Sequence, residues 1–379
     1  MVASVTNKLT PSADAAALTM VDNIIAYLED QADYLYGDEE GTVAILTAMA
    51  NGKFKHKHGE KRVEKPAYQC YKYVKVALVR TQWAKATPVI KDPFEGRSAS
   101  TAGQKLLDNG FTDVTDKMPD SRWASPGDVS VYAWTAARLA SVRSKPGKEN
   151  NPNDGHIDVR SYDNYLTDHI PQHFRPNWSI YDSPRVYRLY HDPVPILRMK
   201  AFLSCLREYE GQEDKDEAKR YQLLNCALPG TNTKHFTSFE THPWADVSKE
   251  ERKGKSTAAG AYQIQYTAWV ELLTGKNSAG VYTANRKMFS LRANENKFTP
   301  ALQDRMAVAL IELREALGHV RKGEIAEAID KLNTEWSSLP GGTENEGRRT
   351  ADKRPMDTGY FNELFDSYLV EEKKKAGVK

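Results

Sequence analysis

Apolar residues recur at helical spacing through the second half of the chain. One face of the segment 201–211 carries four apolar residues at the i, i+3, i+4 and i+7 positions of a helix: Phe202, Cys205, Leu206 and Tyr209. This spacing predicts a helix with one face buried in a core. Similar patterns predict helices within four further ranges: 257–273, 300–317, 325–332 and 360–368.

Shorter apolar runs, bounded by turn-forming residues, characterise residues 66–169. Residues 125–132 have the pattern of a turn followed by a strand, and residues 155–160 have that of a second strand. A turn at 162–164 separates it from a further strand at 165–168. The first half of the chain is therefore predicted to be α+β, and the second half mainly α-helical.

The composition changes between residues 170 and 194, where four prolines interrupt any helix and several aromatic residues supply apolar cover. Such an aromatic content favours an ordered, semi-rigid linker over a disordered tether. At 379 residues the chain is long enough for two domains. We predict a first domain at 1–180, with its core at 66–169, a linker at 181–195 and a second domain at 196–379.

Composition and charge exclude several classes of partner. The net charge of +2 leaves no basic field that would favour nucleic acid. No run approaches the roughly 18 apolar residues of a membrane span, and the N-terminus has no signal-peptide pattern. We therefore expect synthesis in the cytoplasm and no stable membrane insertion. Three cysteines are too few for a disulfide framework, and the spacing of Cys and His residues indicates no metal site and no cofactor.

The helix at 201–211 ends with Glu210 followed by Gly211, a residue type that commonly ends helices. A carboxyl group held partly in apolar surroundings has a raised pKa, because desolvation disfavours its charged form. A carboxylic acid of this kind can act as the general acid of glycosidic cleavage. The alternative is an ordinary solvated glutamate before a helix-ending glycine.

Four further motifs follow Glu210 in a fixed order. They are Phe-Thr-Ser-Phe-Glu-Thr-His-Pro at 236–243, Ser-Thr-Ala-Ala-Gly-Ala-Tyr-Gln-Ile at 256–264, Leu-Gln-Asp-Arg at 302–305 and Glu-Trp-Ser-Ser-Leu-Pro-Gly at 335–341. Over residues 196–342 this order resembles the phage-lambda-type endolysins, which are muramidases of the lysozyme superfamily. The resemblance implies a lysozyme-like fold with Glu210 as the general acid. The chain departs from the family where Ala261 replaces its usual Arg, and where Ser238 and Thr241 replace acidic residues.

Six residues of these motifs are predicted to bind substrate. Gly260 allows a backbone to approach a sugar ring closely, although a tight turn explains this glycine equally well. Gln263 can form a hydrogen bond with an N-acetyl group. Trp336 is large enough to form the floor of a sugar subsite, with burial in the core as the alternative. The remaining three candidates are Glu240, His242 and Tyr262.

A second set of candidate residues lies in the first half. Cys70 falls in the first turn of a predicted helix, where backbone N–H groups stabilise a thiolate; a small buried residue is the alternative. A Pro-Gly-Asp-Val turn and strand at 126–129 and Gly-His-Ile at 155–157 follow it. Over residues 66–169 this arrangement resembles the papain-like cysteine amidases and peptidases of the CHAP and NlpC type, which include type VI secretion amidase effectors. The resemblance implies His156 as the base and Asp168 as the third polar residue, with Asp158 as the runner-up.

Together these resemblances predict a bifunctional peptidoglycan hydrolase. A cysteine amidase or endopeptidase would cut the peptide stem or its amide link, and a muramidase or lytic transglycosylase would cut the glycan strand. We expect an antibacterial type VI effector that acts as a monomer in the periplasm or wall of a target bacterium, with a secretion-spike or carrier protein and a cognate immunity protein as partners. One alternative is a phage endolysin or tail lysin with the same activities. Another is a catalytically silent wall-binding or tail-structural protein.

Overall fold

The computed structural model describes residues 74, 78, 99–144, 155–163, 165–166, 181, 184–189, 192–211, 216–274, 297–346, 349–350 and 355–378. The chain divides into two compact units, an N-terminal unit at Met1–Asp192 and a C-terminal unit at Pro193–Lys379.

A five-stranded antiparallel sheet forms the centre of the N-terminal unit, with strand order β1-β5-β2-β3-β4. Its strands are β1 (Thr112–Asp113), β2 (Val129–Ala133), β3 (Gly155–Arg160), β4 (Tyr165–Leu166) and β5 (Arg185–Arg188). Strand β2 pairs with both β3 and β5, and its first four residues are all buried. The strands expected at 125–132, 155–160 and 165–168 therefore correspond to β2, β3 and β4.

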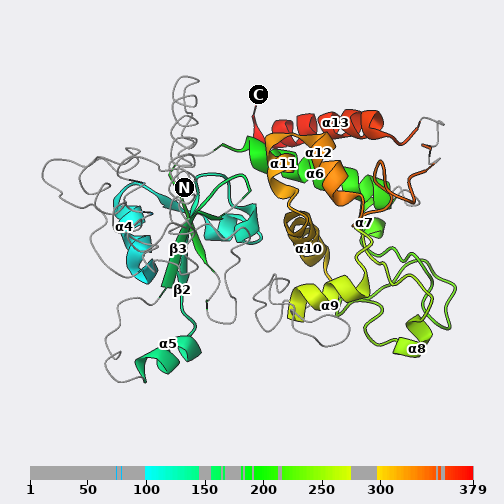
Figure 1. Ribbon diagram of the computed structural model, residues 1–379, viewed down its shortest axis with the longest axis horizontal. Helices are drawn as coiled ribbons and strands as arrows, with labels where there is room; N and C mark the ends of the chain where they lie inside the picture. The colour runs from blue at the N-terminus through cyan, green and yellow to red at the C-terminus, as the bar shows by residue number, and fades with distance from the viewer. Residues whose placement is uncertain are drawn as a thin grey trace, which may run out of the picture. The chain divides into compact units, whose positions relative to one another are not determined.

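Short helices accompany this sheet (Figure 1). They are η1 (Ala99–Thr101), α4 (Ala102–Asp108), η2 (Thr115–Lys117), η3 (Ser121–Trp123) and α5 (Ala136–Arg143). Helix α4 contributes the buried side chains of Ala102 and Leu106 to the core. Its Gly103 packs against Tyr187 of β5 so closely that a Cβ there would lie 2.1 Å from the phenolic oxygen.

Strand β5 corrects the expected linker at 181–195. Its Val186 and Tyr187 are 1% and 4% exposed, because β5 lies between β1 and β2 inside the sheet. Pro184 precedes the strand, a position at which the missing N–H of proline costs no ladder hydrogen bond. Residues 185–188 thus belong to the N-terminal unit, and the division between the units falls after Asp192.

Helices dominate the described part of the C-terminal unit (Figure 1). They are α6 (Val194–Glu210), α7 (Glu217–Arg220), α8 (Lys249–Arg252), α9 (Tyr266–Thr274), α10 (Pro300–Leu313), α11 (Leu317–Lys322), α12 (Ile325–Leu332) and α13 (Thr358–Ala376). Among the residues that the structure describes, no helix has both the length and the apolar character needed to cross a bilayer.

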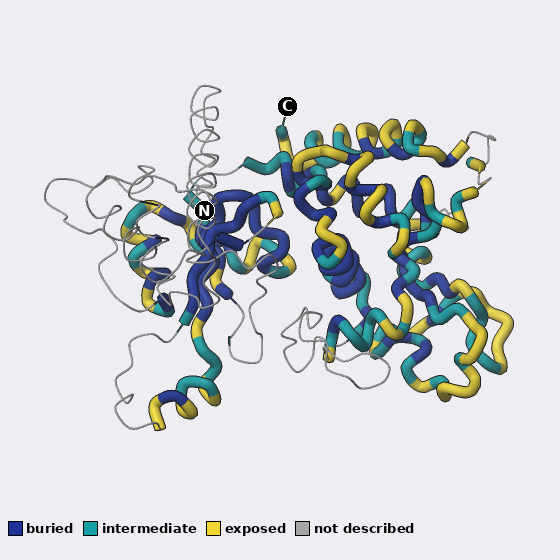
Figure 2. The backbone as a smooth tube through the Cα atoms, in the orientation of Figure 1, coloured by how far each residue is buried: buried dark blue, intermediate teal, exposed yellow. Residues whose placement is uncertain are grey.

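Helix α6 is the central element of this unit, and its predicted buried face is confirmed. Phe202, Cys205, Leu206 and Tyr209 are all 0% exposed. Helix α13 runs alongside α6 (Figures 1 and 2), and the ring of its Phe361 lies 5.3 Å from that of Phe202 and 5.1 Å from that of Tyr209. Burial of an apolar side chain of this size contributes about 1.5–3 kcal/mol to the free energy of unfolding, so this contact fixes α6 in the core.

Local signals explain where the flanking helices begin and end. The Thr299 hydroxyl accepts from the Leu302 N–H at the start of α10, where Pro300 occupies a favourable first position. The Asp357 carboxylate accepts from the Tyr360 N–H at the start of α13, and Gly377 ends that helix with a positive φ of 69°. These local signals fix where α10 and α13 begin and where α13 ends.

Two predicted helix ranges are shorter than expected. The predicted helix at 300–317 already ends at Leu313, and a separate helix, α11, begins at Leu317 after Glu315, which has a positive φ of 59°. Within 257–273 the helix begins only at Tyr266, because Gly260 and Gln263 both have positive φ and form a turn. Tyr262 therefore lies on this turn and not on a helix.

Candidate active site around Glu210

Glu210 is the last residue of α6 and is half-buried. The last helical hydrogen bond runs from the N–H of Gly211 to the Arg207 carbonyl at 2.9 Å, and the chain leaves the helical conformation at Gly211. Only glycine fits after Glu210, since a Cβ at Gly211 would lie 2.8 Å from that carbonyl oxygen and 3.0 Å from the side chain of Arg220. The Glu-Gly pair thus ends the helix with the carboxylate at its terminus.

Ser338 contacts the Glu210 carboxyl group. Its Oγ donates a hydrogen bond to Oε1 of Glu210, and the serine is only 3% exposed. The Asn345 Nδ2 donates to the Ser338 carbonyl at 2.6 Å and to the Met356 carbonyl at 3.1 Å. Both the hydroxyl and the backbone of Ser338 are therefore fixed by the surrounding chain.

The glycines that follow Ser338 are required by a tight turn. Gly341 has a positive φ of 79°, and a Cβ at Gly342 would lie 2.3 Å from the carbonyl oxygen of Ser337. The same carbonyl accepts from the N–H of Glu344 at 3.0 Å. The Leu-Pro-Gly-Gly sequence after Ser338 therefore folds the chain back so that Asn345 reaches the serine.

Tyr262 joins the turn at 259–264 to the other motifs. Its side chain is fully buried, and its hydroxyl donates to Asp304 Oδ1 at 2.6 Å and accepts from Arg207 Nη1 at 2.7 Å. Its carbonyl accepts from the indole N–H of Trp336 at 2.9 Å. Arg207 and Glu210 lie on α6, and Trp336 and Ser338 lie in the turn after α12. The contacts of Tyr262 and those of Ser338 therefore connect the same two segments.

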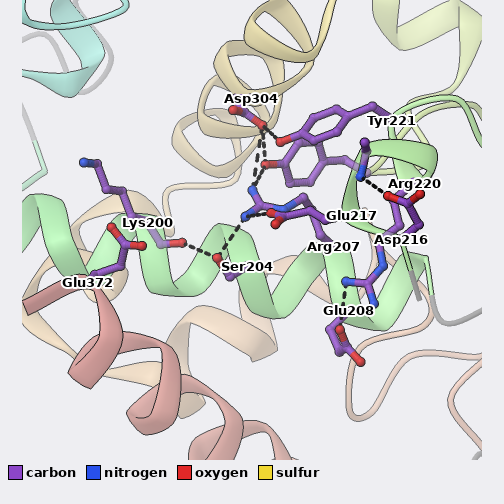
Figure 3. Close-up of polar contacts among 12 residues, drawn as sticks. Lys200, Ser204, Arg207, Glu208, Asp216, Glu217, Arg220, Tyr221, Asp304 and Glu372 are labelled. Carbon is purple, nitrogen blue, oxygen red and sulfur yellow. Dashed lines mark hydrogen bonds and ion pairs between the residues drawn. The ribbon is translucent and has the colours of Figure 1, made fainter. Parts of the chain in front are cut away.

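Asp304 is the acceptor at the centre of this network (Figure 3). It also accepts from the Tyr221 hydroxyl at 2.7 Å, and it lies 3.8 Å from Nη1 of Arg207. Burial raises the pKa of both Tyr221 and Tyr262, so both phenols remain protonated donors at neutral pH. Burial opposes the charge of Arg207, but its phenolic and carboxylate neighbours more than offset it, and the pKa of the guanidinium is raised.

Arg207 makes two more polar contacts on its exposed side, both visible in Figure 3. Its Nη2 donates to Ser204 Oγ at 2.9 Å and forms an ion pair with Glu217 at 3.1 Å. Glu208, the next residue of α6, pairs instead with Arg220 at 2.8 Å. The charges adjoining Glu210 on α6 are thus paired with residues of α7 and α10.

Gln303 explains the glycine at 260. Its Oε1 accepts from the N–H of Ala261 at 2.9 Å, and its Nε2 donates to the carbonyls of Tyr221 and Phe298 at 3.0 Å and 2.9 Å. A Cβ at Gly260 would lie 2.1 Å from Gln303 Oε1. The space in front of Gly260 is therefore filled by protein, and the tight-turn explanation replaces the expected approach of a sugar ring.

Three other candidates for substrate binding have buried side chains, which for Trp336 is the alternative of core burial. Tyr262 and His242 are 0% exposed and Trp336 is 4% exposed. The His242 ring lies with Nε2 3.1 Å from the Ile264 carbonyl, and its Nδ1 accepts from the Trp244 N–H at 3.3 Å. Burial lowers the pKa of His242 to about 4, so the ring is neutral. All three residues belong to or contact the turn at 259–264.

The last two predicted substrate-binding residues keep solvent exposure. Glu240 is exposed and pairs with Lys297 at 2.8 Å. Gln263 is half-buried, with its Nε2 donating to the Gly260 carbonyl at 2.8 Å and its backbone at a positive φ of 46°. A positive φ in a residue other than glycine is uncommon and is often associated with functional turns. Gln263 therefore remains the stronger candidate for substrate contact.

Of the candidate residues in the N-terminal unit, Cys70 and Asp168 lie outside the described residues. His156 and Asp158 share one face of β3, with His156 Nε2 3.7 Å from Asp158 Oδ2. Strand pairing places Tyr132 opposite His156 and Ser130 opposite Asp158. Burial raises the pKa of Asp158 to about 7, against the lowering effect of Tyr132, Arg160 and Ser130. Asp158, the alternative to Asp168 as the third polar residue, is therefore an acidic residue that the structure shows beside His156.

The sequence assigned no role to several residues that build the Glu210 site. Ser338, Gln303 and Asp304 lie inside the quoted motifs, and Arg207 lies one helical turn before Glu210. That spacing was a usable signal for Arg207, because residues three apart on a helix share a face. Within the described ranges, no group of three or more His, Cys, Asp or Glu side chains is placed to hold a metal ion.

Comparisons with known proteins match the C-terminal unit. A family model described as Endolysin matches residues 200–363. The endolysin of Escherichia phage P2 is 34% identical over 147 residues, which cover 37% of this chain and 78% of that protein. The endolysin of Escherichia phage lambda is 32% identical over 142 residues, which cover 38% of this chain and 77% of that protein.

Among solved structures, a bacteriophage lambda lysozyme complexed with a chitohexasaccharide is 25% identical and covers 45% of this chain and 94% of that chain, with a TM-score of 0.31. The papain-like amidase of the N-terminal unit stays a prediction. Through residues 200–363, which carry Glu210 and the motifs that surround it, the chain belongs to the endolysin family.

Proposed function

We propose that the C-terminal unit cleaves the glycan strand of peptidoglycan, with Glu210 as its acid. The observation that carries this proposal is the contact between Glu210 and Ser338, made where the helix-ending Glu-Gly pair meets the Ser-Leu-Pro-Gly turn. A half-buried carboxyl group, oriented by a fixed hydroxyl, can give its proton to the oxygen that links two sugars. Membership of the endolysin family supports peptidoglycan as the substrate.

The chemistry of cleavage depends on whether a second carboxylate serves the site. A retaining hydrolase needs one about 5–5.5 Å from the acid, and an inverting hydrolase one about 6.5–9.5 Å away. Described acidic residues within the motifs have other partners: Glu240 pairs with Lys297, Glu335 with Arg314, and Asp304 accepts from Tyr221 and Tyr262. The same holds on and beside α6, where Glu208 pairs with Arg220, Glu217 with Arg207, and Asp216 accepts from the N–H of Ala218. Glu213 and Asp214 lie outside the described residues.

A single glutamate is sufficient if the sugar supplies its own nucleophile. In this mechanism Glu210 gives its proton to the bridging oxygen as the bond from that oxygen to the anomeric carbon breaks. The 6-hydroxyl oxygen of the same sugar then bonds to the anomeric carbon, and its proton returns to the Glu210 carboxylate. No water is consumed, and the sugar ends as an anhydro ring.

The mass of the released fragments tests this proposal. Purified peptidoglycan treated with the full chain is expected to release muropeptides with anhydro ends, each one water lighter than the hydrolysed form. Hydrolysed ends would instead require a second group that activates water. A complete lack of glycan fragments would favour the catalytically silent wall-binding alternative.

The endolysin matches also bear on the biological role. They favour the alternative of a phage endolysin or tail lysin over a type VI secretion effector. We therefore infer a role in phage-type lysis of the bacterial wall. The delivery route, the carrier and the immunity protein stay predictions.

We also infer a second activity for the N-terminal unit, amide cleavage by Cys70 with His156 as base. The observation that favours it is the adjacency of His156 and Asp158 on one face of β3, because a carboxyl group beside a histidine can orient the ring and stabilise its charged form. The thiolate would attack the amide carbonyl carbon, and the C–N bond would break as His156 gives its proton to the leaving nitrogen. Water would then hydrolyse the thioester, which releases the acid and restores the Cys70 thiol.

Cys70→Ala is expected to abolish the release of peptides from purified peptidoglycan while glycan cleavage continues, because alanine offers no nucleophile. His156→Ala should have the same effect. Mass spectrometry of the soluble products separates the two activities, and Cys226→Ala, which removes a half-buried free thiol of the C-terminal unit, is the matched control. Peptide release that persists in Cys70→Ala would remove the amidase assignment.

A further inference from the structure

Ser338 has a hydroxyl that is placed for one partner. At 3% exposure it has almost no access to water, and a buried hydroxyl is stable only with a hydrogen-bond partner. The Glu210 carboxyl group supplies that partner, through Oε1. The bond spans 128 positions of sequence and joins the end of α6 to the turn after α12.

Further hydrogen bonds fix the chain on both sides of Ser338. Two residues earlier, Trp336 is anchored by its indole N–H on the Tyr262 carbonyl. Seven residues later, Asn345 donates to the carbonyl of Ser338 itself and to that of Met356. A hydroxyl on such a fixed turn can restrict a glutamate, whose side chain otherwise has three rotatable bonds.

The direction of the bond also has an electrostatic effect. A hydroxyl that donates to a carboxylate stabilises the ionised form relative to the protonated form. A group that must give up a proton and later accept it back benefits when the two forms are close in free energy at the working pH. Glu210 is half-buried at the end of α6, and the Ser338 hydroxyl donates to its Oε1.

We propose that Ser338 is a positioning residue for Glu210, which fixes the orientation of its carboxyl group and sets the upper pH limit of glycan cleavage. This inference rests on the proposed function of Glu210. In this proposal Ser338 affects proton transfer indirectly, through its contact with Glu210.

The test compares Ser338→Ala with Ser337→Ala in the full chain, using the pH dependence of kcat/KM for glycan release. Ser337 is the neighbouring half-buried serine. Its contact within the turn is made by its backbone carbonyl, which accepts from the N–H of Glu344. Ser338→Ala should lower kcat by roughly 10- to 100-fold with little change in KM. The alkaline limb of the pH profile of Ser338→Ala, the pH range in which its activity falls as the pH rises, should move up by about one pH unit, because loss of the donor disfavours the carboxylate.

Two further variants separate positioning from folding. Ser338→Thr retains a hydroxyl and should keep the alkaline limb of the wild type, whereas Ser338→Cys preserves the packing with a weaker donor and should move the limb upward. An unchanged limb in both Ser338→Ala and Ser338→Cys, or an equal shift in Ser337→Ala, would overturn the inference.

A readout independent of activity distinguishes this inference from the proposed function. The carboxyl ¹³C signal of Glu210 can be followed by NMR through a pH titration of the wild type and Ser338→Cys. An upward move of the midpoint in the variant supports the inference even if no glycan is cut, and such inactivity would count against the proposed function alone. Identical midpoints in the two proteins would overturn the inference whatever the activity.

Discussion

Glu210→Gln is expected to lower the rate of glycan release by about a hundred- to ten-thousand-fold, the contribution typical of a general acid. Glutamine preserves the size of the side chain and an oxygen that can accept from Ser338, so the fold should be retained. It has no proton that it can give to the leaving oxygen. The rate is measured as soluble saccharide released from purified peptidoglycan.

Glu240→Gln is the matched control for this substitution. Glu240 lies in the neighbouring motif, is exposed and pairs with Lys297, so its neutralisation should change the rate far less. Amide cleavage by the N-terminal unit should be unaffected in both variants. A Glu210→Gln protein that retains the wild-type rate would place the acid elsewhere.

Asp304→Ala is expected to have the largest effect on stability. It removes the acceptor shared by Tyr221 and Tyr262 and the nearby countercharge of Arg207. Polar groups left without partners in the interior cost about 1–3 kcal/mol each. The aspartate side chain is 30% exposed, so water replaces part of the loss, and we expect a destabilisation of about 3 kcal/mol.

The measurement is the thermal unfolding of the C-terminal unit, whose Tm should fall by roughly 6–12 °C. Asp330→Ala is the control, since Asp330 is an exposed residue of α12, and it should change the stability by no more than about 0.5 kcal/mol. Equal Tm values for Asp304→Ala and Asp330→Ala would show that the network around Asp304 does not stabilise the unit.

The elements with strong local patterns could be predicted from the sequence. The range 325–332 agrees with α12, and the buried face of α6 follows directly from its apolar spacing. Strand β5 could not be found in this way, because its four residues become a strand only by pairing with β1 and β2, which are distant in the chain. The prolines around it indicated a linker instead.

The same difference between local signals and tertiary contacts decides which parts of the candidate site could be predicted. Glu210 was found because its helix and the glycine after it are local signals. The burial of Tyr262 and His242 could not be predicted, and that of Trp336 was one of two open alternatives, because an aromatic residue has the same sequence pattern whether it lines a subsite or fills a core. The turn at 259–264 depends on Gln303, more than 35 positions away, and Ser338 meets Glu210 only in the folded protein. Partners of this kind are set by tertiary packing.

Mass spectrometry of the fragments released from purified peptidoglycan tests the central claim most directly, with the wild type and Glu210→Gln treated identically. We predict anhydro-ended glycan fragments from the wild type and no glycan fragments from the variant. Hydrolysed ends from the wild type would contradict the single-glutamate mechanism. Glycan fragments in wild-type amounts from Glu210→Gln would contradict the assignment of the site itself.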